Sequence, residues 1–126
     1  MKILKVLALA TALLGPGCGV AVMTPDNVTV HPMQIESVDV LVAESLPVQV
    51  SARVQGIIPD GCSRLGSVSV LRAGNAITLD VLVARDSDGP CIQVIGLYDQ
   101  VHRLPGEFPP GRYKLTVNGV VRDFVI

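Results

Sequence analysis

The sequence predicts an all-β fold, an antiparallel β-sandwich of about seven strands over residues 35–126. From Ile35 onward apolar and polar residues alternate, and no stretch shows the period of an amphipathic helix. Hydrophobic residues make up 49% of the chain, yet the only aromatic residues are two Tyr and two Phe. The core must therefore be built from Val, Ile and Leu, and the β-branched members of that set favour strands.

Alternating valines define the first two predicted strands. Within residues 37–42 valines occupy every second position, and the positions between them hold Ser37, Asp39 and Leu41. Pro47 introduces a second strand, residues 48–55, in which apolar and polar residues alternate without interruption. Such a strand is typical of a sheet that is buried on one face and solvated on the other.

The middle of the chain predicts two strands joined by a tight reversal. After a turn at Pro59-Asp60-Gly61, residues 67–72 and 77–83 form strands on either side of Gly74-Asn75. Glycine supplies the positive φ that a two-residue hairpin needs. A further turn over residues 85–90 leads into an irregular run through Leu104, in which the sequence defines no exact strand.

The last residues give the strongest local pattern. Pro109-Pro110-Gly111 turns the chain, and Asn118-Gly119 is the most favourable two-residue hairpin sequence. The apolar residues on either side of this hairpin lie on one face of the predicted pair. Arg122 is the exception on that face, and its long stem is expected to lie along the rim of the core.

The end of the chain also resembles a known kind of domain. Its motif Pro-Gly-x-Tyr-x-x-x-Val-Asn-Gly, residues 110–119, resembles the closing hairpin of bacterial immunoglobulin-like modules. With the turns at 59–62 and 74–75 and with Cys91, the pattern from Val48 to Ile126 resembles small secreted bacterial domains of uncharacterised function. The resemblance implies an immunoglobulin-like sandwich and carries no activity. Because the chain has no Trp, it departs from antibody-type domains and leaves the topology open.

The N-terminal segment has the order of a signal peptide. Lys2 and Lys5 form a short positive region, and Val6–Leu14 is an apolar run of the length expected for a signal-peptide core. This run is too short to span a bilayer, which needs about 20 apolar residues. Residues 1–17 are therefore predicted to be a signal peptide, with a buried helix as the alternative, and residues 18–34 a lipid-anchored or flexible tether.

The segment Leu13-Leu14-Gly15-Pro16-Gly17-Cys18 resembles a bacterial lipobox, in which an obligatory Cys marks cleavage and lipidation. The resemblance implies that Cys18 becomes an acylated N-terminal residue and that its lipid attaches the protein to a membrane. Gly15 stands where the motif usually has Leu, so plain secretion remains the alternative. Either outcome places the domain outside the cytoplasm.

If Cys18 is lipidated, Cys62 and Cys91 remain as a pair. In an oxidising compartment such a pair is expected to form a disulfide, and the alternative is two separately buried thiols. A disulfide would bring residues 56–64 close to residues 85–95. The candidate binding loops therefore contain the charged residues of these two segments, namely Asp60, Arg64, Arg85, Asp86 and Asp88.

The sequence offers no motif for a metal or a cofactor. The Asp-x-Asp-Gly fragment at residues 86–89 has too few oxygen ligands for a calcium loop, and Asp and Gly are ordinary turn residues. His102 is the only histidine after residue 34, and no nucleophile lies beside it in a recognisable motif. There is also no phosphate-binding loop and no Cys-x-x-Cys motif.

These observations predict a non-enzymatic, extracytoplasmic interaction or structural module of the bacterial envelope with an unidentified protein partner. Removal of Lys2 and Lys5 would change the formal net charge from −1 to −3, which disfavours nucleic acid as a partner. Two alternatives remain open. One is a small-ligand or metal-binding protein of the periplasm, and the other is a protease-inhibitor-like loop scaffold.

Overall fold

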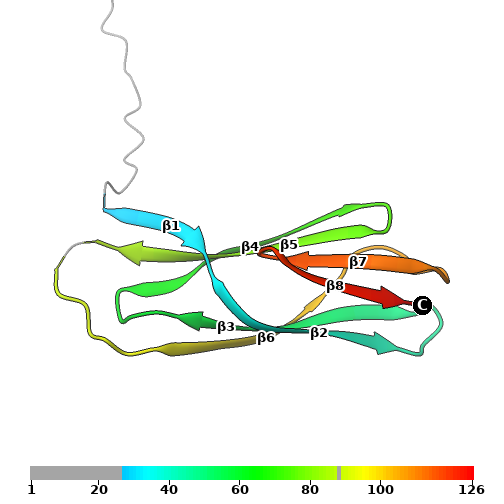
Figure 1. The fold of residues 1–126 in the computed structure, drawn as a ribbon, viewed down its shortest axis with the longest axis horizontal. Helices are drawn as coiled ribbons and strands as arrows, with labels where there is room; N and C mark the ends of the chain where they lie inside the picture. The colour runs from blue at the N-terminus through cyan, green and yellow to red at the C-terminus, as the bar shows by residue number, and fades with distance from the viewer. Residues whose placement is uncertain (1–26, 88) are drawn as a thin grey trace, which may run out of the picture.

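The computed structural model describes residues 27–87 and 89–126, and it confirms the predicted all-β sandwich (Figure 1). Eight strands form two sheets that pack face to face. None of the described residues forms a helix long and apolar enough to cross a membrane. The strands are β1 (Val28–Pro32), β2 (Gln34–Ala43), β3 (Gln49–Ile58), β4 (Ser63–Ala73), β5 (Ala76–Asp86), β6 (Gly96–Arg103), β7 (Arg112–Val117) and β8 (Val120–Val125).

The larger sheet is organised around β5. Strand β4 pairs with β5 along its whole length, from Ala73 opposite Ala76 to Ser63 opposite Arg85. The other edge of β5 is shared, because β7 pairs with residues 76–79 and β1 pairs with residues 82–86. Strand β8 then pairs with β7 at the edge of the sheet. The smaller sheet has the order β2-β3-β6, and both of its pairs are antiparallel.

The last part of the predicted tether forms a strand, β1, which corrects the prediction. Residues 28–32, assigned to the tether from the sequence, pair with β5 and extend the larger sheet. Pro32 ends β1, and the chain crosses to the smaller sheet at Met33, which is buried and donates its N–H to the Val81 carbonyl. This pairing provides hydrogen-bond partners for N–H and C=O groups of β5 that would otherwise be unpaired at an open sheet edge. The rest of the tether, residues 18–26, and the predicted signal peptide lie outside the described residues.

The sequence predicts an antiparallel sandwich, and the structure differs in one strand pair, because β5 and β7 run parallel. Between them the chain forms β6 in the opposite sheet and then returns. A chain that crosses to the second sheet and comes back re-enters the first sheet in its original direction. The predicted irregular run between residues 91 and 104 contains this strand, β6.

The core lies between the sheets and contains the apolar residues at the predicted alternating positions. The most deeply buried side chains come from β3, β5 and β7, with Tyr98 and Tyr113 as the aromatic members on β6 and β7. Aliphatic burial at this density is the main stabilising contribution in a small β-domain. The fully buried residues are Val50, Ala52, Val54, Ile77, Leu79, Val81, Val83, Leu115 and Val117.

Both predicted two-residue hairpins are confirmed. Gly74 has φ +61°, and Asn118 and Gly119 have φ +46° and +84°. The Asn118 side chain does more than form the turn. Its Nδ2 donates to the carbonyls of Met33 and Val81, and its Oδ1 accepts from the Val81 N–H at 2.9 Å. Asn118 therefore fills the gap along β5 between Val117 at the end of β7 and Pro32 at the end of β1.

Candidate functional site

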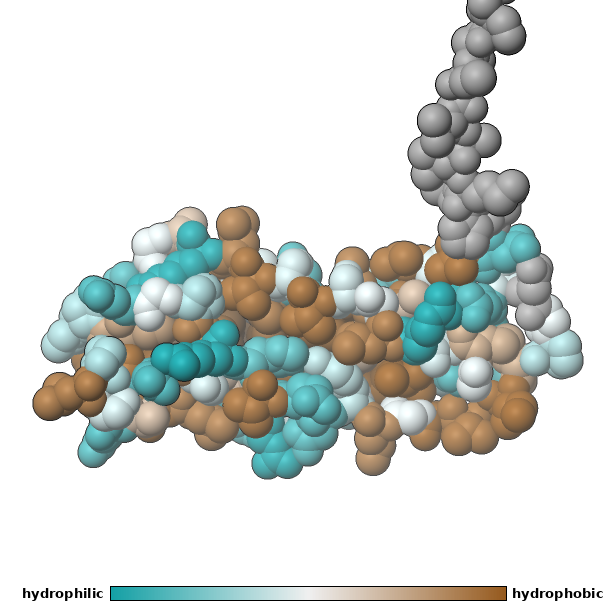
Figure 2. All heavy atoms as spheres, turned by 180° about the vertical axis from the view of Figure 1, so that it is seen from behind, coloured by the Kyte–Doolittle hydropathy of each residue, from teal (hydrophilic) through white to brown (hydrophobic). Residues whose placement is uncertain are grey.

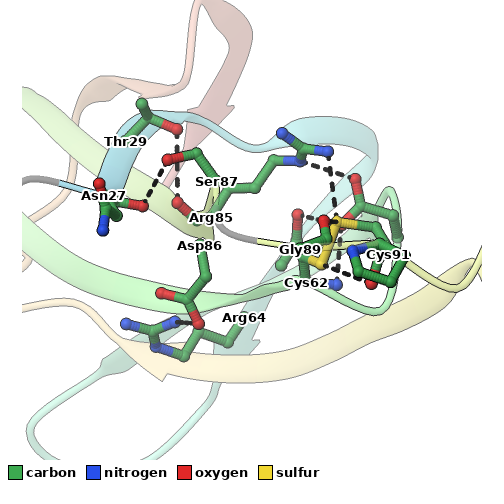
Figure 3. The surroundings of a disulfide bond; sticks show 12 residues. Asn27, Thr29, Cys62, Arg64, Arg85, Asp86, Ser87, Gly89 and Cys91 are labelled. Carbon is green, nitrogen blue, oxygen red and sulfur yellow. Dashed lines mark hydrogen bonds and ion pairs between the residues drawn. A yellow bond between two sulfur atoms is a disulfide. The ribbon is translucent and has the colours of Figure 1, made fainter.

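The predicted disulfide between Cys62 and Cys91 is present, with 5.3 Å between the two Cα atoms. Cys62 ends the turn before β4, and Cys91 follows β5, so the bond joins the two segments that the sequence predicts as a composite surface (Figure 3). The Gly61 N–H donates to the Ile92 carbonyl at 2.7 Å and reinforces this link. We call this end of the sandwich the disulfide end.

Asp60 organises the turn beside the disulfide. Its Oδ1 accepts from the Cys62 N–H at 3.0 Å and from the Ser63 hydroxyl at 2.8 Å, and its Oδ2 accepts from Arg85 Nε at 2.9 Å. The hydrogen bond from Arg85, followed by that from Ser63, holds the pKa of the Asp60 carboxyl below its ordinary value. Arg85 also reaches Cys91 Sγ at 3.5 Å. The carboxylate is thus a structural partner of the turn.

A second, more exposed ion pair lies beside the first. Arg64 Nη1 contacts Asp86 Oδ2 at 2.9 Å, and each side chain is about half exposed. The structure therefore brings together Asp60, Arg64, Arg85 and Asp86, four of the five predicted loop residues, while Asp88 lies outside the described residues. Because these four charges pair with one another, little of their charge is left for a partner.

The same region contains one group of metal-type ligands. Single ligand atoms of Asp60, Cys62 and Cys91 lie within 4.8 Å of one another. However, the ligand form of cysteine is the thiolate, and both sulfurs are joined in the disulfide. In the disulfide-bonded protein this group is therefore not arranged to hold a cation.

The loop after the disulfide presents an apolar surface, which we call the apolar loop (residues 92–97). Four of its six residues have exposed aliphatic side chains: Ile92 at 72%, Val94 at 58%, Ile95 at 65% and Leu97 at 83%. None of its residues is charged. In Figure 2 hydrophobic side chains gather at the end of the molecule that carries this loop. The sequence signal for this surface is an aliphatic run without alternation, which is equally typical of a buried segment.

The neighbouring sheet also exposes charged side chains. Arg53 of β3 and Asp99 of β6 form a two-hydrogen-bond ion pair at 2.9 and 2.7 Å, and Gln55 adds a bond to Asp99. The Arg53 guanidinium holds the pKa of the Asp99 carboxyl below its ordinary value. The apolar loop thus continues into a sheet whose exposed side chains include this ion pair as well as the aliphatic Val101.

Comparison with known proteins identifies the domain. The family model described as the ORF11 beta-sandwich domain matches residues 52–126. The protein belongs to this family. The matched region contains both ends of the disulfide and the apolar loop, whereas Cys18 lies outside it.

Relatives of this ORF11 beta-sandwich protein come from Herpetosiphon aurantiacus. An uncharacterized 10.2 kDa protein in the HgiCIIM 5′ region is 38% identical over 88 residues, which cover 70% of the present chain and 94% of the relative. Two uncharacterized 10.2 kDa proteins, in the HgiBIM and HgiEIM 5′ regions, are each 30% identical over 76 residues, with 60% and 93% coverage. No solved structure matches the chain. The family assignment therefore carries the fold and no activity.

The single histidine within the matched region of the ORF11 domain, residues 52–126, is His102 on β6. The His102 side chain is half-buried and shares a 2.7 Å hydrogen bond between its Nε2 and the Tyr98 hydroxyl. Burial lowers the pKa of His102 and raises that of Tyr98. Among the described residues no Ser, Cys or carboxylate hydrogen-bonds to His102, so no nucleophile is positioned by this imidazole.

A groove of the ORF11 domain lies far from the disulfide. It has a volume of about 670 Å³ and is lined at the opposite end of the sandwich by the β4–β5 turn, β7 and β8. The stacked rings of Tyr113 and Phe124, with centroids 5.3 Å apart, form part of its wall beside Lys114 and Asp123. The sequence prediction placed ligand-binding loops only near the disulfide and missed this groove.

Proposed function

We propose that this protein is a non-enzymatic interaction module of the bacterial cell envelope, exported from the cytoplasm and attached to a membrane through lipid on Cys18. The Cys62–Cys91 disulfide supports an oxidising compartment, where such bonds form and persist. The signal-like segment 1–17 and the lipobox-like segment ending at Cys18 support export and anchoring. Both segments precede the folded residues.

The exposed aliphatic side chains of the apolar loop are the observation that carries the interaction role. Small soluble domains expose apolar residues singly, and a contiguous group of them marks a contact site. Here four such residues fall within six positions, beside a covalent bond that fixes the start of the loop. The neighbouring charged residues pair with one another and are satisfied without a partner.

A non-enzymatic role fits the state of the ionisable groups. Asp60 and Arg85 hold each other in the turn, and His102 is occupied by the Tyr98 hydroxyl. General acid–base chemistry needs a group with an open position within hydrogen-bond reach of a substrate atom. Neither of these two pairs lines the groove at the opposite end of the sandwich.

The proposal is tested on the protein isolated from its native cells. We expect a mature chain that begins at Cys18, carries acyl groups detectable by mass spectrometry, and fractionates with membranes. Thiol labelling of the denatured protein should find Cys62 and Cys91 oxidised, and Cys18→Ser should release the protein from the membrane fraction. A cytoplasmic chain that retains Met1 and has both thiols free would overturn the proposal.

A second candidate function, small-ligand binding, is favoured by the groove at the opposite end. Its volume of about 670 Å³ lies within the range of roughly 300–1,000 Å³ typical of ligand sites. Stacked Tyr113 and Phe124 would supply the apolar wall, and Lys114 and Asp123 the polar groups. Native mass spectrometry of the protein purified from its own cells tests this candidate, because a bound small molecule would add its mass to the folded chain.

A further inference from the structure

We propose that the apolar loop rests on the surface of the lipid bilayer to which the N-terminal segment attaches the domain. This inference deepens the proposed function and rests on it, because it names the partner of the exposed aliphatic side chains. Three features of the described structure carry it: where the chain enters the sandwich, what the loop exposes, and how firmly the loop is held.

The chain enters the sandwich at the same end as the apolar loop. The N–H and hydroxyl of Ser87 donate to the Asn27 carbonyl at 2.7 and 2.8 Å, and Val28 pairs with Asp86 (Figure 3). Cys18 precedes Asn27 by nine residues, which span at most about 30 Å when fully extended. A lipid on Cys18 would therefore keep the disulfide end, rather than the opposite end, within reach of the bilayer.

The chemistry of the loop fits lipid better than protein. Its exposed side chains are all aliphatic except Gln93, and it contains no charged or aromatic residue. The centres of protein interfaces are enriched in Tyr, Trp and Arg, none of which this loop offers. Two charged neighbours, Asp60 and Arg85, pair with each other, which lowers the cost of bringing them near a less polar phase.

The backbone of the loop is held so that its side chains remain outside. Cys91 is covalently fixed, the Ile92 carbonyl accepts from Gly61, and the Val94 N–H also donates to the Ile92 carbonyl at 2.9 Å. At the far end Leu97 belongs to β6, where it pairs with Ile57 of β3. With the backbone held in this position, the exposed aliphatic side chains can leave water only by contacting something else.

A contact of this kind supplements an anchor. A single acyl chain holds a protein only marginally at a membrane, and a second apolar contact strengthens the attachment. The contact would also fix the orientation of the sandwich, with the disulfide end toward the bilayer and the groove at the β4–β5 turn away from it.

The experiment uses tryptophan as a probe, since the chain has none. Ile95→Trp places a probe in the apolar loop, and Leu71→Trp places a matched control on β4, where the native side chain is 71% exposed. Leu71 is eight residues along β4 from Ser63, about 26 Å from the disulfide end. The variants are made in the chain from residue 18 with Cys18→Ser, which retains every described contact, and near-identical thermal unfolding to the parent verifies folding.

Each variant is tethered through an N-terminal hexahistidine tag to phosphatidylcholine vesicles that contain a nickel-chelating lipid and brominated phosphatidylcholine. We expect the Ile95→Trp emission to shift to shorter wavelength and to be quenched at least twofold by the brominated lipid, while Leu71→Trp changes little. Adding Val94→Gln and Leu97→Gln should remove most of the quenching of Ile95→Trp. The artificial tether makes this result independent of whether Cys18 is acylated, so failure here and failure of the proposed anchor are distinguishable.

Two outcomes would overturn the inference. One is equal quenching, or none, for Ile95→Trp and Leu71→Trp on tethered vesicles. The other is a concentration-dependent shift of Ile95→Trp in solution without vesicles, which would assign the apolar loop to contact between two copies of the chain.

Discussion

The two ends of the sandwich hold their loops by different chemistry. At the disulfide end, a covalent bond and the Asp60–Arg85 ion pair join the loops before β4 and after β5. At the opposite end, Arg72 holds the connection between β6 and β7 without any covalent link. Its guanidinium donates to the carbonyls of Gly74, Pro105 and Glu107 at 2.9, 2.7 and 2.6 Å.

The difference lies in where each loop places its apolar side chains. In the β6–β7 connection, Leu104 and Phe108 are buried, and Arg72 lies over the Phe108 ring at 4.3 Å. That loop stays in place because it contributes to the core. The apolar loop is fixed by the disulfide and contributes its aliphatic side chains to the surface instead. A covalent link removes the need for a loop to bury apolar residues, which leaves those residues available for contact.

The largest effect should follow from breaking the disulfide. In the chain-entropy model, closing a loop of this length stabilises the fold by about 3.5 kcal/mol, so Cys62→Ser with Cys91→Ser should lower the free energy of unfolding by about that amount. Denaturant unfolding measures the loss. The parent protein in reductant should have the same free energy of unfolding as the double variant. Cys18→Ser is the control and should unfold like the parent. A loss below about 1 kcal/mol would show that hydrogen bonds alone hold the disulfide end.

The opposite end should be weakened by Arg72→Ala. The variant loses three hydrogen bonds and the contact with Phe108, and we expect destabilisation by about 2 kcal/mol. Hydrogen exchange should accelerate most in residues 104–109 and little in the apolar loop. Arg103→Ala is the matched control, because its side chain makes no hydrogen bond or ion pair with any described residue, and it should change stability by less than about 0.5 kcal/mol.

Combining the two changes tests whether the ends are independent. Distant sites without shared contacts usually add to within about 0.5 kcal/mol. The triple variant with both serines and Arg72→Ala should therefore lose the sum of the two separate effects. A larger coupling free energy would mean that the ends communicate through β4, which begins next to the disulfide and contains Arg72.

Much of the fold could be predicted because its signals are local. The alternation of apolar and polar residues in 48–55 and 77–83 indicates which face of each strand is buried. This signal is local because successive side chains of any strand point to opposite faces. Asn118-Gly119 predicts a hairpin because both residues tolerate positive φ, and both adopt it. The disulfide could also be predicted, because once Cys18 was assigned elsewhere only one pairing remained.

The missed features depend on contacts between distant segments. Strand β1 forms because the backbone of β5 beyond the end of β7 is open for pairing. The sequence of Val28–Pro32 contains no information about that open edge. The parallel direction of β7 follows from the path of the chain through β6. The exposure of the apolar loop depends on a core that other strands had already filled, so an aliphatic run there was equally compatible with burial.

Strand β6 joins the two loops of the comparison and contains the half-buried His102. Burial lowers the pKa of His102 in the folded protein, whereas the unfolded chain takes up a proton near pH 6.5. The unfolded state then binds more protons, so stability should fall as the pH decreases below about 6.5 and level off below the folded pKa. Chemical unfolding between pH 8 and 5 measures this slope.

The free energy of unfolding of His102→Gln should depend less on pH than that of the parent between pH 8 and 5, because glutamine does not titrate. The Asp60 and Asp99 carboxyls, whose pKa values are lowered by Arg85 and Arg53, should lose their contribution only at more acidic pH, as the pH falls through about 4 and below. A parent profile that rises as the pH falls from 7 to 5 would contradict the assigned burial of His102.

The smallest effect is expected from the exposed ion pair at the disulfide end. Arg64 and Asp86 are each about half exposed, and pairs of this kind typically contribute about 1 kcal/mol or less. A double-mutant cycle with Arg64→Ala and Asp86→Ala should give a coupling free energy in that range, and it should shrink in 1 M salt, where the screening length is about 3 Å. The same cycle on Asp60 and Arg85 should give a larger value, because the Asp60 side chain is only 11% exposed and water screens this pair less. If Arg64–Asp86 were instead the stronger pair, the more exposed of the two ion pairs would contribute more to holding the disulfide end than the Asp60–Arg85 pair of the turn.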